Sequence, residues 1–144
     1  MIEQDTIKLL RECDAGIKMG ISSIDDILEY VGDEKLKNLL SASKDQHIKL
    51  QDELETLLDK YHDDGKEPNP MAKGMSWVKT NVMLAINESD HTIADLMTEG
   101  YNMGIKSLSK YLNQYKCADE DSKDITKRII EVEERVVKDI REFL

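Results

Sequence analysis

Apolar residues recur every three or four positions along most of this chain, and proline interrupts it at only two places, Pro68 and Pro70. This spacing sets the apolar side chains on one face of a helix, and the proline-free stretches leave room for helices of many turns. Aromatic residues make up 5% of the chain and charged residues 35%, which is typical of helical bundles rather than sheets. We therefore expect a single all-α domain over residues 1–144.

The chain is acidic, with 30 acidic against 20 basic side chains and a net charge of −10. Because this charge repels phosphate backbones and anionic bilayers, we expect neither nucleic acid nor a membrane surface as a partner. No apolar run approaches the roughly 20 residues of a membrane span, and the first residues do not resemble a signal peptide. Cys13 and Cys117 have no metal-binding or redox spacing, and two thiols alone favour a cytoplasmic location.

The first half of the chain predicts a helical hairpin over about residues 5–63. Asp5 and Thr6 are candidate N-caps of the first helix, and Gly32 can end that helix in a left-handed conformation. Asp33 can then cap the second helix, and a connection this short requires the two helices to run antiparallel. The buried faces are expected to consist of Ile7, Leu10, Asp14, Ile17, Ile21, Ile24, Leu28 and Val31 in the first helix, and of Leu36, Leu40, Ser43, His47, Leu50, Leu54, Leu57 and Tyr61 in the second.

A crossover at about residues 64–89 separates this hairpin from a second one at about residues 90–144. Apolar spacing over residues 71–86 predicts an extra helix within the crossover. A polar stretch rich in capping residues precedes residue 90, so we expect a break there rather than one continuous helix over residues 70–115. The helices of the second hairpin are expected at about residues 90–115 and 121–143.

The two hairpins share a sequence motif. Residues 16–24 read GIKMGISSI and residues 100–108 read GYNMGIKSL, so Gly, Met, Gly, Ile and Ser recur at matching positions. With a two-residue adjustment, residues 53–58 align with residues 139–144. The match predicts a repeated hairpin whose halves cover each other. Glycines four residues apart expose helix backbone, which favours close helix–helix contact; the alternative is a ligand that approaches this backbone.

Two related hairpins joined by a long crossover resemble the ferritin-like superfamily. The crossover is long enough to return along the bundle, which permits an up-down-down-up order of helices. Di-iron members of the superfamily take a Glu from the first helix of each hairpin and a Glu-x-x-His from the second. Here Lys44 stands three residues before His47, and the fourth helix has no histidine. The resemblance therefore implies the fold without the di-iron activity, as in small ferritin-like proteins of unassigned function.

The candidate site consists of polar residues inside the apolar faces. Asp14, His47 and Glu133 are expected at mid-bundle, within about one helical turn of each other. We expect them to form a structural polar layer, in which the two acids pair with His47 or Lys18. The alternative is a metal site formed by these three residues, with Glu99 as a candidate fourth ligand, which would take iron, manganese or zinc.

No complete set of catalytic residues is recognisable in the sequence, so we expect no catalytic residue and no cofactor. The expected function is that of a non-catalytic ferritin-like bundle that acts by assembly or protein interaction. Self-association into a homo-oligomer is expected, because four-helix proteins of this kind often keep an apolar stripe outside the core. The alternative function is metal binding at the mid-bundle carboxylate and histidine residues.

Overall fold

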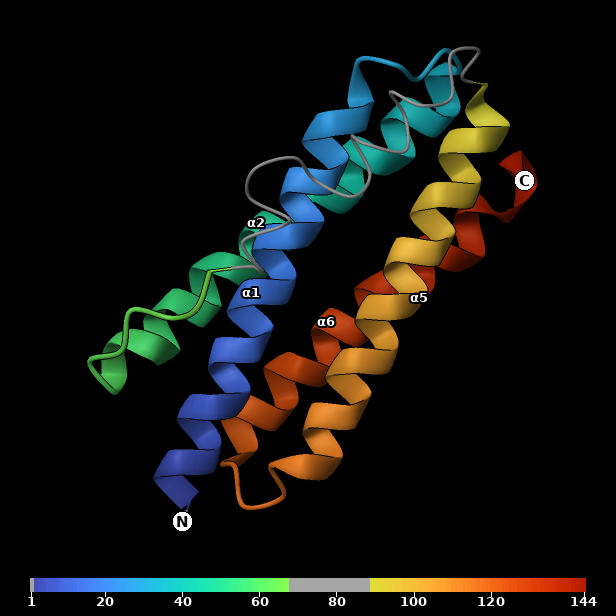
Figure 1. The fold of residues 1–144 in the computed structure, drawn as a ribbon. Helices are drawn as coiled ribbons and strands as arrows, with labels where there is room; N and C mark the ends of the chain where they lie inside the picture. The colour runs from blue at the N-terminus through green and yellow to red at the C-terminus, as the bar shows by residue number, and fades with distance from the viewer. Residues whose placement is uncertain (1, 68–88) are drawn as a thin grey trace.

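The computed structural model describes residues 2–67 and 89–144, and this part of the chain is entirely helical apart from its connections. The helices are α1 (Ile2–Leu28), α2 (Glu34–Lys60), α5 (Asp90–Gln114) and α6 (Glu120–Asp139), followed by a 3₁₀ turn, η1 (Ile140–Phe143) (Figure 1). The predicted all-α fold with four long helices is confirmed. The extra helix predicted over residues 71–86 lies outside the described residues.

Polar N-caps fix the start of three helices. Asp33 caps α2 as predicted, Ser89 caps α5 and Asp119 caps α6; in each case the side-chain oxygen accepts a hydrogen bond from a backbone N–H of the first turn. The backbone of Ser89 is extended, so α5 begins at Asp90. The prediction that residues 70–115 are not one continuous helix is therefore confirmed.

The prediction for the start of α1 was wrong. The helix begins at Ile2, so Asp5 and Thr6 lie inside it rather than before it. Their side chains bind the α5–α6 connection instead: Asp5 Oδ2 accepts a hydrogen bond from Cys117 N at 3.0 Å, and Thr6 Oγ1 accepts one from Asp119 N at 2.8 Å. These contacts hold the start of α1 against the turn that joins α5 to α6.

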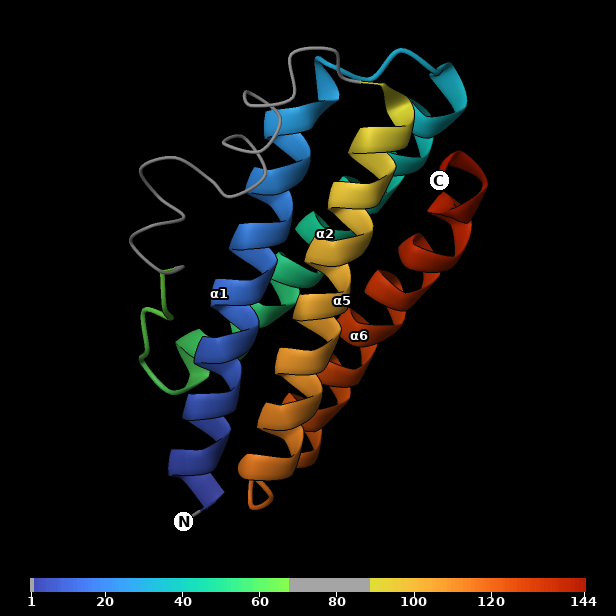
Figure 2. The same cartoon turned by 45° about the vertical axis from the view of Figure 1, so that its right-hand side comes forward.

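Gly32 does not adopt the predicted left-handed conformation; among the described glycines, only Gly65 has a positive φ, of 83°. The backbone N–H groups of Gly32 and Asp33 instead donate to the carboxylate of Asp90, each at 2.8 Å. This contact places the start of α5 beside the α1–α2 connection. Consequently α1 and α6 run in one direction, while α2 and α5 run in the other (Figure 1). In both views α1 and α5 lie side by side (Figure 2).

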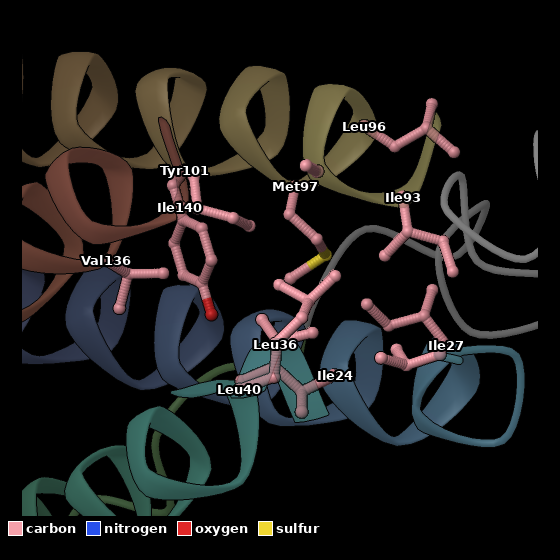
Figure 3. Packing of buried hydrophobic residues seen from close by; sticks show 12 residues of the cluster. Ile24, Ile27, Leu36, Leu40, Ile93, Leu96, Met97, Tyr101, Val136 and Ile140 are labelled. Atoms are coloured by element: carbon pink, nitrogen blue, oxygen red, sulfur yellow. The ribbon is translucent and has the colours of Figure 1, made fainter. Parts of the chain in front are cut away.

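Two apolar clusters fill the bundle. One packs around the end that holds the α1–α2 connection, and Figure 3 shows how its side chains from the four helices meet. The other fills the opposite half. The first consists of Ile24, Ile27, Val31, Leu36, Leu40, Ile93, Ala94, Leu96, Met97, Tyr101, Val136 and Ile140, and the second of Leu10, Cys13, Ile17, Leu50, Leu54, Leu58, Leu108, Ile125, Ile129 and Ile130. On each helix, the positions between these two sets form the middle layer of the bundle.

Candidate ligand-binding site

Each helix contributes one residue to this middle layer: Gly20 from α1, His47 from α2, Gly104 from α5 and Glu133 from α6. A Cβ atom on Gly20 would lie 3.0 Å from His47 Nε2, and a Cβ atom on Gly104 would lie 3.0 Å from Glu133 Oε2. Within each hairpin, a glycine thus makes room for the titratable side chain of the neighbouring helix. For these two glycines, close helix–helix contact is the correct interpretation.

His47 and Glu133 also correspond in the sequence. The alignment that sets residues 53–58 against 139–144 also sets His47 against Glu133, just as the shared motif sets Gly20 against Gly104. The layer therefore has one imidazole and one carboxyl group at matching positions of the two hairpins. The first hairpin therefore contributes a base to the layer, and the second contributes an acid.

His47 is fully buried and neutral. Its Nδ1 lies 2.7 Å from the carbonyl oxygen of Ser43, so Nδ1 carries the proton and donates to that oxygen. Burial lowers the pKa of His47 below its usual value of 6.5, although the bond to Ser43 partly opposes this shift. Nε2 of the ring has no hydrogen-bond partner among the described residues. The imidazole ring lies 6.0 Å from the ring of Tyr101, measured between centroids.

Glu133 is the second buried group of the layer, with 4% of its surface exposed. Its Oε2 has no hydrogen-bond partner among the described residues. Burial raises the pKa of Glu133 from 4.5 to about 8, because the carboxylate loses its hydration and none of the described residues serves as its counter-ion. At neutral pH the carboxyl group is therefore mostly protonated.

The buried titratable groups next to the middle layer, Cys13 and Tyr101 of the two apolar clusters, are also neutral. Burial raises the pKa of the Cys13 thiol to about 12, and Glu133 adds to that shift. Burial raises the pKa of the Tyr101 phenol as well, again with a contribution from Glu133. Because His47 is neutral too, none of these three side chains supplies a positive charge to Glu133.

Asp14 belongs to a different set of contacts. It is 2% exposed, and its Oδ2 accepts a hydrogen bond from Lys66 N at 2.9 Å and lies 2.9 Å from Lys18 Nζ. The predicted pairing of Asp14 with Lys18 is therefore confirmed. Glu133, by contrast, forms no ion pair within the described part of the chain, so the prediction that it pairs with His47 or Lys18 was wrong.

The four predicted metal ligands do not come together as one set. Glu99 is exposed on α5, and Asp14 is bound to Lys18 and Lys66. Within residues 2–67 and 89–144, no three His, Cys, Asp or Glu side chains form a group that could hold a metal ion. Metal binding by Asp14, His47, Glu133 and Glu99 stays a prediction from the sequence.

A cavity of about 720 Å³ lies between α1 and α5, and Glu133 lines it from α6. The repeated motif forms both of its sides, with Gly16 and Gly20 on α1 and Gly100 and Gly104 on α5. A Cβ atom on Gly16 or Gly100 would have no neighbour within 4 Å, so these two glycines face open space. For this pair, the alternative interpretation of backbone left open to a ligand fits better than close helix–helix contact. The apolar part of the wall includes Met19, Met97, Met103, Tyr101 and Tyr111.

The described part of the chain is thus a bundle of four long helices with a cavity beside a buried acid. Searches against protein-family models, curated proteins and solved structures found no match. In the part of the chain that the structure describes, no helix has the length and hydropathy needed to cross a membrane.

Alanine substitutions at the four glycines separate their two roles. Gly16→Ala and Gly100→Ala should each raise the free energy of unfolding by about 0.5–1 kcal/mol, because alanine favours the helix and the new methyl group meets open space. Gly20→Ala and Gly104→Ala should each lower it by about 1–2 kcal/mol, because the methyl group presses on His47 or Glu133. Urea denaturation measures all four values, and equal effects at the four positions would contradict this assignment.

Proposed function

We propose that this protein is a ferritin-like helical bundle that binds a small molecule in the cavity between α1 and α5. The observation that carries the proposal is the Glu133 carboxyl group, which is 4% exposed, unpartnered at Oε2 among the described residues and part of the cavity wall. A buried polar atom without a partner costs about 1–3 kcal/mol, and a ligand that bonds to it recovers that cost. The cavity also has the size and mainly apolar wall common to small-molecule sites.

The ferritin-like assignment is part of this proposal. It is supported by the directions of the four helices, which correspond to an up-down-down-up order, and by the long crossover between the hairpins. The shared glycine motif supports the idea that the two hairpins are repeats. The assignment concerns the fold and does not extend to di-iron chemistry.

The other roles expected from the sequence rest on the sequence alone. They are assembly or protein interaction, self-association, a cytoplasmic location and metal binding. The cavity offers a more specific basis for a function, because it combines the volume of a small-molecule site and a mainly apolar lining with Glu133 Oε2, which has no partner among the described residues. We therefore place binding in the cavity first.

Binding of Nile red, a neutral dye that fluoresces in apolar surroundings, tests whether the cavity accepts a ligand. We expect saturable binding of one dye molecule to the wild-type protein. The double variant Gly16→Leu/Gly100→Leu should weaken this binding at least tenfold, because both side chains extend into open space in the cavity. Fluorescence titration gives the two dissociation constants.

The matched control is the double variant Ser22→Leu/Asn102→Leu. It adds the same two side chains to exposed positions of α1 and α5 that do not line the cavity. We expect it to bind Nile red as the wild type does. No saturable binding to the wild type, or equal binding by both double variants, would contradict a ligand site in the cavity.

A further inference from the structure

The charged residues around the cavity are mostly acidic. Glu12, Glu67 and Glu133 line it, and Lys66 is the one basic residue among its described lining residues. The ammonium group of Lys66 lies 2.7 Å from Glu12 Oε1, so its charge already has an acidic partner. The ammonium group of Lys18 likewise lies 3.1 Å from Glu67 Oε1, so Glu133 is the lining acid for which the described residues offer no ion-pair partner.

Within residues 2–67 and 89–144, no positively charged group forms an ion pair with Glu133. The titratable groups that interact with it are Cys13 from α1 and Tyr101 from α5, and both are neutral at pH 7. His47, which α2 contributes to the same layer, is neutral as well. On the helix of Glu133, the nearest charged neighbours, Glu131, Glu134 and Arg135, are all exposed to solvent. A cation inside the cavity would thus be the counter-ion that the described residues do not provide.

The apolar and aromatic lining of the cavity can contact the uncharged part of such a ligand. Methionines give an adaptable apolar surface, and the rings of Tyr101 and Tyr111 offer aromatic faces to a positive charge. A ligand with an apolar body and one ammonium group would match both features. An uncharged ligand could donate a hydrogen bond to Oε2, but it would not act as a counter-ion to the Glu133 carboxylate.

We infer that the cavity binds an organic cation, an ammonium group on an apolar body, with Glu133 as its counter-ion. The inference rests on the proposed function, because it names the class of ligand for the same cavity. Binding forms no covalent bond. The amine enters already protonated, the Glu133 carboxyl group releases its proton to solvent, and the ammonium N–H then donates to the carboxylate.

Three probes with the same phenylpropyl body test the charge that the site prefers: phenylpropylamine, phenylpropanol and phenylbutyrate. Each is titrated against the Nile red complex at pH 8.5 and displacement is measured. We expect the amine to bind at least tenfold more tightly than the alcohol, and the carboxylate to bind most weakly. Glu133→Gln should reduce the affinity for the amine to that for the alcohol, while Glu131→Gln, an exposed acid on the same helix, should leave the preference unchanged.

The pH dependence gives a second measurement. Because each bound amine displaces one proton from Glu133, the affinity for the amine should rise about tenfold per pH unit below pH 8, the region where the carboxyl group is protonated. Calorimetry at pH 6.5 in buffers of different ionisation enthalpy should show about one proton released per amine. The affinity for the alcohol should not change with pH in this range.

The outcomes separate the two proposals. Nile red binding without a preference for the amine, or with a preference that survives Glu133→Gln, would overturn the organic cation and leave the cavity site standing. If neither Nile red nor any phenylpropyl probe binds, the proposed function itself fails, and this inference fails with it. A preference for the amine that depends on Glu133 and on proton release would support both.

Discussion

Glu133→Gln should make the protein more stable at alkaline pH, by about 2–5 kcal/mol at pH 9. In the native protein Glu133 keeps its proton up to about pH 8, whereas the unfolded chain loses it near pH 4.5. Between these values the native state binds more protons than the unfolded state, so the free energy of unfolding falls as the pH rises. The contribution of Glu133 is fully present below pH 4.5 and is lost as the pH passes 8. Its upper limit is about 5 kcal/mol.

Glutamine has nearly the same shape as a protonated glutamate and cannot ionise. The variant should therefore match the wild type within about 1 kcal/mol at pH 4.5, and exceed it increasingly as the pH rises. Urea denaturation at several pH values, followed by circular dichroism, measures this difference. Glu131→Gln on the exposed face of α6 is the control, and it should leave the pH profile unchanged. A parallel profile for Glu133→Gln and wild type would mean that the native carboxylate is not destabilised by burial.

His47 affects the free energy of unfolding at acidic pH. Its pKa is lowered in the native state, so the stability from its neutral form is present above pH 6.5 and is lost as the pH falls through the lowered pKa. Glu133 acts in the opposite direction on the alkaline side. The wild-type protein should accordingly be most stable between the two titrations. Removing the Glu133 carboxyl group should shift that maximum to higher pH.

The periodicity of the sequence was sufficient to predict the helices, because each helix buries a regular apolar face. It was less accurate at the helix ends, where tertiary contacts decide the outcome. Thr6 looks like an N-cap in the sequence, but its hydroxyl group binds the α5–α6 connection. At the end of α2, Leu58 is buried, whereas Leu57, which was predicted for that face, is only partly buried.

Of the predicted polar layer, His47 and Glu133 lie in the middle layer, whereas Asp14 belongs to the contacts of Lys18 and Lys66. His47 and Glu133 stand out in the sequence as polar residues on apolar faces, and both are buried. Neither has an ion-pair partner among the described residues. This depends on which residues of the other helices face them, and no pattern within one helix contains that information. The cavity depends likewise on the separation of α1 from α5. The signal available in the sequence was the motif glycine at residue 16 and its counterpart at residue 100. Neither has a side chain, and none of the described residues fills the space beside them.

Asp14→Ala should lower the free energy of unfolding by about 3 kcal/mol. The carboxylate is 2% exposed, accepts a hydrogen bond from Lys66 N and pairs with Lys18, so its loss leaves a part-buried N–H without its acceptor and an ammonium group without its nearest partner. Gly65 packs directly on this carboxylate, in a left-handed conformation, so the whole turn after α2 depends on it. Urea denaturation at pH 7 measures the loss.

Glu12→Ala is the matched control, because Glu12 binds the same residue, Lys66. It pairs with the half-exposed ammonium group of Lys66, whereas Asp14 accepts a hydrogen bond from the Lys66 backbone N–H. This variant should lose at most about 1 kcal/mol. Equal losses for the two variants would mean that the hydrogen bond from Lys66 N to Asp14 adds no stability.

The predicted role of Asp14 as a metal ligand leads to a different expected result. The melting temperature of the wild type would rise on addition of iron, manganese or zinc, and that of Asp14→Ala would not. A loss of about 3 kcal/mol that persists with chelator present would assign Asp14 to the turn after α2, because metal cannot then account for its contribution.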